Sequence, residues 1–166
     1  RQLQELVAAT RENANLCVRD GDKVIYIDHV ASPDHDLQAF TRLGGSAPLY
    51  ASGVGKVFLS AFVEEALQAY VERVSLRAFT PQTLTTRRAL RGEIRKVREQ
   101  GYALDDEEKA LGVRCVAAPV YDHRGEIVAA ISVSGAAQRI PVERLPELAA
   151  LLMDRAARLS AALGYE

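Results

Sequence analysis

The strongest constraint on the fold lies between residues 113 and 135, where two segments of alternating character flank a tight turn. The first segment, VRCVAAPV, places Cys115 on one side of a strand and its neighbours Arg114 and Val116 on the other. The letters DHRG at residues 122–125 are typical of a short turn, and EIVAAISVSG follows as a second alternating segment. This pattern predicts an antiparallel hairpin.

Two hydroxyl groups share one face of the returning strand. Because strand side chains repeat every two residues, Ser132 and Ser134 point the same way. The opposite face takes the apolar residues Ile127, Ala129, Ile131 and Val133. Burying a hydroxyl without a hydrogen bond costs about 1–3 kcal/mol. We therefore expect the serine pair to line a small polar cavity.

Further elements are predicted around this hairpin. The segments NLCVRD and KVIYIDHV flank a turn at Gly21 and predict a second hairpin. Helices are predicted over residues 3–13, 63–74 and 86–100. A further helix is expected to begin near Gly53 with Ser52 as its N-cap, and another to begin after Pro141. Prolines and glycines in residues 31–53 predict an irregular excursion or a short strand before the helix at Gly53. Hairpins separated by helices favour an α+β fold, with helices packed on an antiparallel sheet.

Length and charge narrow the classes of function. We expect residues 1–166 to form a single domain, because 166 residues leave little room for two. The balance of 21 basic and 22 acidic residues disfavours nucleic acid or an anionic membrane as a direct partner. No apolar run approaches the roughly 20 residues of a membrane-spanning helix. Cys17 and Cys115 lack C-x-x-C spacing, which predicts reduced thiols and a cytoplasmic location.

A glycine-containing helix start is the first candidate ligand site. In the segment SGVGK at residues 52–56, the free N–H groups of the first helical turn can meet an anion. The spacing differs from the G-x-x-x-x-G-K-[ST] phosphate loop, which disfavours nucleotide phosphate. The alternative is that the two glycines only allow the helix to pack closely on the sheet.

The acidic run at residues 105–108, DDEE, most simply predicts a solvated turn. Paired-carboxylate catalysis would need a further carboxylate that converges from elsewhere in the fold. The sequence indicates no such partner, so this chemistry is disfavoured.

Cysteine and histidine offer a second chemistry. Cys115 with His29, His35 or His123 would form a thiol–imidazole pair. A lone strand cysteine is more commonly an inert apolar residue. The histidines have no metal-ligand spacing, so we expect no metal site.

Several segments resemble the effector-binding domain of the IclR family of bacterial transcription regulators. They are LYASGVGKVFL from Leu49, EIRKVREQGYALDDEEKALGVRCVAAPVYDHRGEIVAAISVSG from Glu93, and the Arg139 that follows. With the N-terminal hairpin, the resemblance covers essentially the whole chain. It implies an α+β, GAF-like fold with a central antiparallel sheet, helices on both faces and a pocket on one face.

The resemblance also implies which residues line that pocket. They are Gly53, Val54, Asp105, Val113, Cys115, Ser132 and Ser134, with Leu37 and Phe40 as apolar walls. Tyr50 stands where the family commonly has a histidine, which removes that position from the set. Backbone donors at the helix start and the serine hydroxyls would hold a carboxylate. Asp105 would bond a ligand hydroxyl or a bridging water, or be protonated, so a hydroxy or keto acid fits.

Family members carry an N-terminal winged helix-turn-helix domain that contacts DNA, and no basic recognition helix occurs in this sequence. The resemblance therefore implies a sensing domain, not an enzyme, that has no cofactor and reaches operator DNA only through the missing N-terminal domain. A small carboxylate effector would act by favouring one homodimer or tetramer arrangement. No membrane partner is expected.

Two other classes of function remain open. One is a cysteine-dependent small-molecule enzyme of GAF-like fold that uses Cys115. The other is a pure oligomerisation module whose interface is the helix from Leu145 to Leu163.

Overall fold

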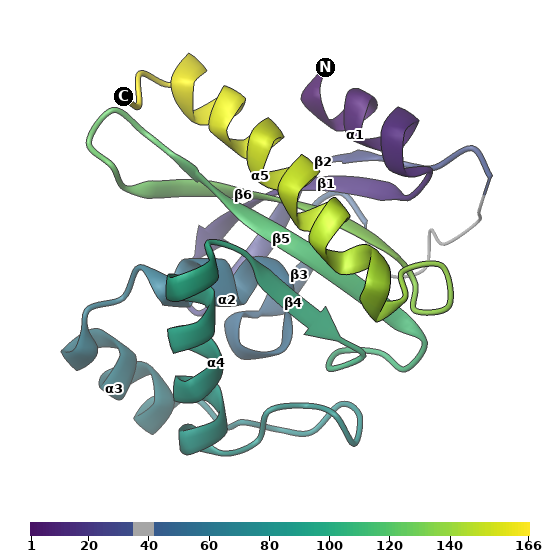
Figure 1. Cartoon of the computed structure of the whole chain (residues 1–166). Helices are drawn as coiled ribbons and strands as arrows, with labels where there is room; N and C mark the ends of the chain where they lie inside the picture. The colour runs from purple at the N-terminus through teal and green to yellow at the C-terminus, as the bar shows by residue number, and fades with distance from the viewer. Residues whose placement is uncertain (35–41) are drawn as a thin grey trace.

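The computed structural model describes residues 1–34 and 42–166, and a six-stranded sheet lies at its centre (Figure 1). The strands run in the order β3-β2-β1-β6-β5-β4. Their bounds are β1 Asn13–Asp20, β2 Lys23–Val30, β3 Ser46–Pro48, β4 Ala103–Asp106, β5 Val113–Tyr121 and β6 Ile127–Ala136. Each neighbouring pair is antiparallel. Both predicted hairpins are confirmed, and they meet where β1 pairs with β6.

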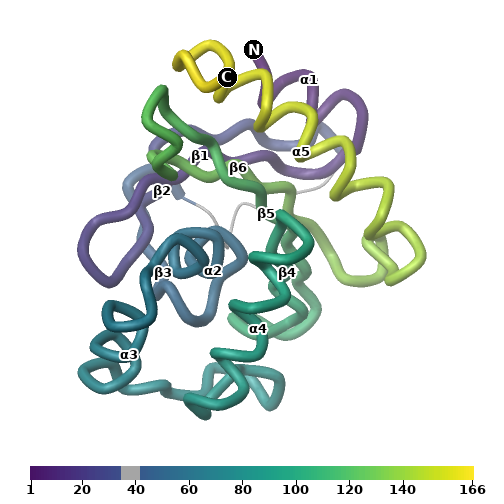
Figure 2. Tube along the Cα trace, turned by 60° about the vertical axis from the view of Figure 1, so that its left-hand side comes forward, coloured from purple at the N-terminus to yellow at the C-terminus, as the bar shows by residue number. Residues whose placement is uncertain are grey.

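Helices cover both faces of this sheet (Figures 1 and 2). On one face lie α1 (Gln2–Thr10) and α5 (Leu145–Ala162). On the other lie α2 (Gly53–Ser60) and α4 (Arg87–Gln100), with α3 (Glu64–Arg73) beside them. Two short 3-10 turns, η1 (Leu49–Ala51) and η2 (Val142–Arg144), precede α2 and α5. The predicted α+β, GAF-like architecture with helices on both faces is confirmed.

Two apolar clusters hold these layers together, one on each face. Ile131 and Val133 of β6 pack with Leu152 of α5 in the cluster under α1 and α5. Val57 of α2 and Ile94 of α4 belong to the cluster on the other face. The alternation along β6 therefore sends its apolar side chains to α5 and its hydroxyl side chains towards α2.

The helix ends show where local chemistry overrides the periodic pattern. α1 ends at Thr10, before the predicted end at residue 13, because Arg11 adopts the left-handed conformation with φ of 63°. α5 begins at Leu145 and not directly after Pro141, because η2 occupies the residues between them. The predicted end of α4 is confirmed, and Gly101 follows it with φ of 82°, a conformation that favours glycine.

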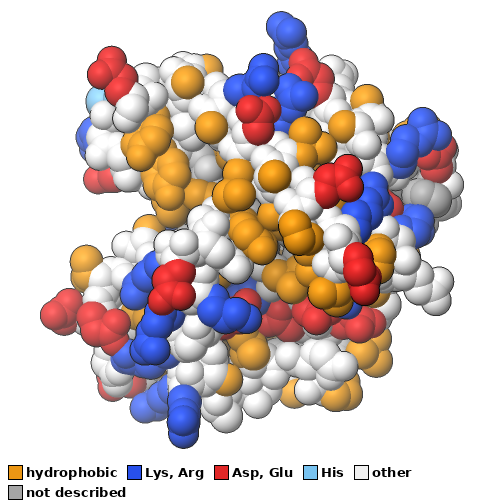
Figure 3. Space-filling model, viewed as in Figure 1, with side chains coloured by type: hydrophobic (Ala, Val, Ile, Leu, Met, Phe, Trp, Pro, Cys, Tyr) orange, Lys and Arg blue, Asp and Glu red, His pale blue; other side chains and the backbone are white. Residues whose placement is uncertain are grey.

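Charged side chains of both signs are interspersed over the face shown in Figure 3, in keeping with the formal net charge of −1. Hydrophobic side chains on this face gather along α5, where Pro119, Met153 and Ala157 line a groove. Within the described ranges, none of the helices is long and apolar enough to span a membrane.

Candidate functional site

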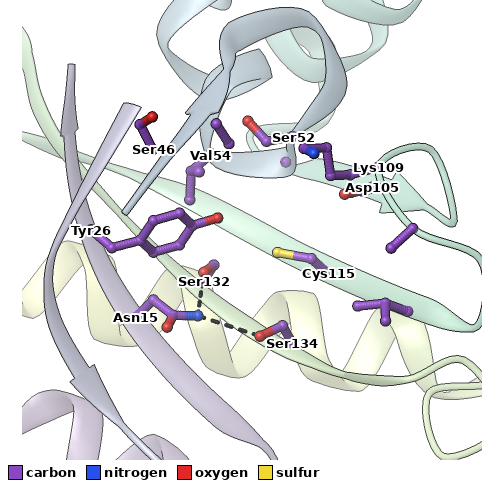
Figure 4. A pocket seen from close by; sticks show the side chains of 14 residues that line it. Asn15, Tyr26, Ser46, Ser52, Val54, Asp105, Lys109, Cys115, Ser132 and Ser134 are labelled. Carbon is purple, nitrogen blue, oxygen red and sulfur yellow. Dashed lines mark hydrogen bonds between the residues drawn. The ribbon is translucent and has the colours of Figure 1, made fainter. Parts of the chain in front are cut away.

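A cavity of about 320 Å³ lies between the start of α2 and the polar face of the sheet (Figure 4). Its lining residues are Asn15, Tyr26, Ser46, Ala47, Ser52, Gly53, Val54, Asp105, Lys109, Ala110, Val113, Cys115, Ser132 and Ser134. Seven of these come from the predicted set, so the structure brings Gly53, Val54, Asp105, Val113, Cys115, Ser132 and Ser134 together around one cavity. The predicted walls Leu37 and Phe40 lie outside the described residues, as does His35.

The serine pair forms the floor of the cavity together with an asparagine. Ser132 and Ser134 are buried, and the fully buried Asn15 donates from its Nδ2 to both hydroxyl oxygens, at 3.2 and 3.3 Å (Figure 4). Asn15 reaches them because it pairs directly with Ser132 across β1 and β6. Sequence reasoning missed Asn15. The alternation in β1 places it on the same face as Cys17, and this pattern could have identified it as a residue that faces the cavity.

The start of α2 forms the roof. Ser52 is the N-cap, as predicted: its Oγ accepts the Gly55 N–H at 3.1 Å and donates to the Pro48 carbonyl at 3.0 Å. The N–H groups of Gly53 and Val54, in the first turn, have no acceptor within the helix. They remain the donors that the helix can offer to an anion in the cavity.

The two glycines of this segment differ in whether a side chain would fit. A Cβ on Gly55 would come within 2.3 Å of the Leu49 carbonyl oxygen, so only glycine fits there. A Cβ on Gly53 would meet the Cys115 sulfur at 3.5 Å. Gly55 is therefore required by packing, whereas a side chain at Gly53 would make only ordinary contacts with strand β5.

Asp105 lies in the wall of the cavity, and the prediction of a solvated turn for the acidic run is wrong. Asp105 and Glu108 are 6% and 5% exposed, and the Asp105 Oδ1 accepts the Glu108 N–H at 2.8 Å. Burial, and then the charge of Glu108, raises the pKa of the Asp105 carboxyl to about 7. A large part of this group is therefore protonated at neutral pH, which lets it donate as well as accept a hydrogen bond.

A buried lysine explains why the acidic run turns inward. Lys56 of α2 is fully buried, and its Nζ lies 2.8 Å from the Glu108 Oε2 and 3.3 Å from the Glu93 Oε1. The same Nζ donates to the Leu104 carbonyl. These bonds join the first turn of α2 to the wall that carries Asp105. Sequence reasoning used Lys56 only to exclude a phosphate loop.

Cys115 projects into the cavity as a neutral thiol (Figure 4). Burial, followed by the charge of Asp105, raises its pKa to about 12, so very little thiolate is present at neutral pH. In the described part of the chain, the cavity lining contains no histidine. His123 is exposed in the turn between β5 and β6, and the His29 Nδ1 bonds to the Asn15 Oδ1.

Two residues noted in the sequence lie away from the cavity. Tyr50 is buried elsewhere, where its hydroxyl donates to the Arg77 carbonyl at 2.8 Å. Arg139 pairs with the buried Glu12 at 2.9 Å, at the junction of α1 and β1. Within residues 1–34 and 42–166, no group of three or more His, Cys, Asp or Glu side chains could hold a metal ion.

An antiparallel sheet with helices on both faces and a polar cavity beneath a helix start defines a GAF-like domain with a ligand-type pocket. The model of the family "bacterial transcriptional regulator IclR C-terminal" matches residues 1–161, and the chain belongs to this family.

The relatives of the chain are regulators of transcription. It is 37% identical over 164 residues to the HTH-type transcriptional regulator KdgR of Escherichia coli, an alignment that covers 99% of this chain and 62% of KdgR. The crystal structure of Thermotoga maritima IclR matches with a TM-score of 0.93 at 36% identity, covering 99% of this chain and 66% of that one. The chain spans 60–64% of the length of the first curated relatives that it matches.

One structural relative was solved with a small acid. The inducer-binding domain of PobR from Acinetobacter, as a double mutant in complex with 3-hydroxybenzoic acid, matches with a TM-score of 0.88 at 28% identity. The match covers 96% of this chain and 93% of that one.

Proposed function

We propose that this chain is the effector-binding domain of an IclR-type transcription regulator and that its effector is a small organic acid. The observation that carries the proposal is the single cavity in which Gly53 and Val54, at the start of α2, face Ser132 and Ser134 (Figure 4). Its volume, about 320 Å³, is at the lower end of the range for small-molecule sites, roughly 300–1,000 Å³. This size suits a small metabolite.

The ligand carboxylate would lie between the helix start and the serine hydroxyls. Free N–H groups and the helix dipole favour negative charge there. Val113 and Cys115 would form an apolar side, and Asp105 would bond a ligand hydroxyl or carbonyl, or a bridging water. This arrangement favours a hydroxy or keto acid. We include Leu37 and Phe40 as further walls on the basis of the family resemblance.

Regulation would follow from differential binding. An effector that binds one arrangement of a homodimer or tetramer more tightly shifts the population towards that arrangement. DNA contact would come from a helix-turn-helix domain of the kind that the name of KdgR records, and not from this chain directly. We place the regulator in the cytoplasm, which the two free thiols Cys17 and Cys115 support.

Thermal-shift and calorimetric screening of glyoxylate, pyruvate, sugar acids and 3-hydroxybenzoate tests the proposal. An acid present at 100 times its Kd stabilises the folded state by about 2.7 kcal/mol. This corresponds to a rise in Tm of about 5–10 °C for a chain of this size. Ser134→Ala should respond much less to the same acid, whereas Ser60→Ala, outside the cavity, should respond like the parent. If no acid raises the Tm, or if Ser134→Ala responds fully, the proposed site is wrong.

The pKa of Cys115 weighs against the alternative of a cysteine-dependent enzyme, because a nucleophilic thiol needs a depressed pKa and burial raises this one. The relatives are regulators, in agreement with a binding role. Iodoacetamide labelling at neutral pH separates the two: we expect slow modification of Cys115, and rapid modification would favour the enzyme.

The packing of α5 weighs against the alternative of a pure oligomerisation module. Its buried residues Ala149, Leu152 and Ala156 pack in the apolar cluster with the sheet of the same chain. This face of α5 is therefore not available to a second chain as an interface.

A further inference from the structure

The hydrogen bonds along the polar floor of the cavity form a chain that involves an asparagine and a histidine. His29, Asn15 and Ser132 form one row across strands β2, β1 and β6. The Asn15 Oδ1 lies 2.7 Å from the His29 Nδ1, and the Asn15 Nδ2 donates to the hydroxyls of Ser132 and Ser134. The fully buried amide thus has a partner for its oxygen and for both of its N–H groups.

The tautomer of His29 and the direction of this amide are linked. A carbonyl oxygen cannot donate, so the short contact to the Asn15 Oδ1 requires a proton on the His29 Nδ1. If the amide were reversed, its N–H₂ group would face that N–H, and two donors would oppose each other in a buried site. With the proton on Nδ1, the Asn15 oxygen points towards β2 and its N–H₂ group towards the serines, as in the structure, whereas a proton on Nε2 alone would match the reversed amide.

The direction of the amide fixes what the serines can do. A hydroxyl has one donor and two acceptor positions. Because Ser132 and Ser134 each accept a bond from Asn15, each keeps its own O–H to donate. The Cys115 thiol, a weak hydrogen-bonding group, lines the same cavity as Ser132 and can give way to a ligand oxygen. A reversed amide would accept from the serines and leave them as acceptors for ligand donors.

We propose that Asn15, oriented by His29, is a specificity-determining residue: it sets the serine pair as hydrogen-bond donors, so that the site selects ligands with an acceptor group over those with a donor group at this position. The Asn15 amide is neutral, whereas an acidic side chain at this position would repel an anionic ligand. The choice of ligand class rests on the proposed function, whereas the direction of the amide does not.

The first test needs no ligand. Heteronuclear NMR of the ring nitrogens of His29 in the 166-residue chain distinguishes a protonated from an unprotonated Nδ1. We expect a protonated Nδ1, and an Asn15 side-chain N–H₂ signal that changes when Ser132 and Ser134 are both replaced by alanine. An unprotonated Nδ1 overturns the inference, whatever the chain binds.

The second test uses a matched pair of probes, 3-hydroxybenzoate and 3-hydroxybenzyl alcohol, measured by calorimetry. Asn15→Asp offers oxygens in place of the N–H₂ group and draws the serine protons to itself, and because it also adds a negative charge, the uncharged variant His29→Leu is measured beside it. We expect Asn15→Asp to weaken the anion at least about tenfold and to change the affinity for the alcohol less than about threefold, as expected for the loss of one or two hydrogen bonds. An unchanged ratio of the two affinities overturns the inference.

Asn13→Asp is the matched control, because the Asn13 side chain lies on the same strand and accepts the Ser32 N–H through its Oδ1, a bond that aspartate retains. It should leave the ratio of affinities near that of the parent. If Asn15→Asp does not fold, His29→Leu, which removes the orienting donor at a half-buried position without adding a charge, tests the same claim. It should lower the preference for the anion, and His29→Asn, which keeps an N–H near the position of Nδ1, should restore it.

The two proposals fail in different ways. If neither probe binds the parent while the His29 Nδ1 is protonated, the proposed acid effector fails for this class of acid and the direction of the amide stands. If 3-hydroxybenzoate binds and the ratio does not depend on Asn15, the acid-binding function stands and Asn15 is not a specificity determinant.

Discussion

The two faces of strand β6 meet very different surroundings. Ile131 and Val133 point towards α5 and pack in a closed apolar cluster, whereas Ser132 and Ser134 point towards α2 and line a cavity. On the first face, helices fill the space above the sheet. On the second, the start of α2 stands over the strands and leaves a hollow whose polar groups bond to one another. The difference separates residues that stabilise the fold from residues that are available to a ligand.

The largest expected effect concerns the charges that hold the wall of the cavity in place. Lys56→Met leaves the buried Glu108 carboxylate without its partner, which we expect to lower the free energy of unfolding by about 3–5 kcal/mol in urea denaturation. The double variant Lys56→Met, Glu108→Leu should recover much of this loss. Lys109→Met is the control, since the Lys109 cation lies over the Phe79 ring and should contribute about 1 kcal/mol or less. A stable single variant would show that the cavity wall does not depend on this ion pair.

The next effect compares neighbours on β6 directly. Ile131→Ala removes a fully buried side chain from the packed face, and we expect a loss of about 2–5 kcal/mol. Ser132→Ala, on the cavity side, should lose less, about 1–2 kcal/mol, because it creates no void in a packed cluster and leaves one Asn15 N–H without its acceptor beside a hollow. Urea denaturation of both variants measures the contrast. Equal losses would mean that the two faces of β6 contribute equally to the free energy of unfolding.

A third effect is the pH dependence that Asp105 gives to the cavity side. Its folded pKa, about 7, exceeds its ordinary value of 3.8, so protonation favours the folded state. The stability that protonation contributes is complete below about pH 4 and is lost as the pH rises through 7, by roughly 4 kcal/mol.

Asp105→Asn should remove this dependence, so the stability of the variant relative to the parent should rise between pH 4.5 and 7.5. Chemical denaturation of both proteins at a series of pH values measures the difference. A constant difference would show that the carboxyl has an ordinary pKa and stays charged throughout.

Local periodicity accounts for the features that sequence reasoning predicted. The alternation around Ser132 and Ser134 identifies their shared face, and Ser52 marks the start of α2, because both signals lie within a few residues of the feature. The place of Asn15 in the cavity depends on its pairing with Ser132, which lies 117 positions further along the chain. Lys56 and Glu108 form an ion pair although 52 positions separate them. No local pattern specifies such pairings. The acidic run was misjudged for the same reason, since its buried cation comes from a distant helix.

The most direct test of the central claim is a crystal structure of this chain with the acid that gives the largest thermal shift in the screen. We predict that the ligand occupies the cavity, with its carboxylate within hydrogen-bond distance of the Gly53 or Val54 N–H and of the Ser132 and Ser134 hydroxyls. A carboxylate turned away from both the helix start and the serines, or a ligand bound in the groove along α5, would contradict the account.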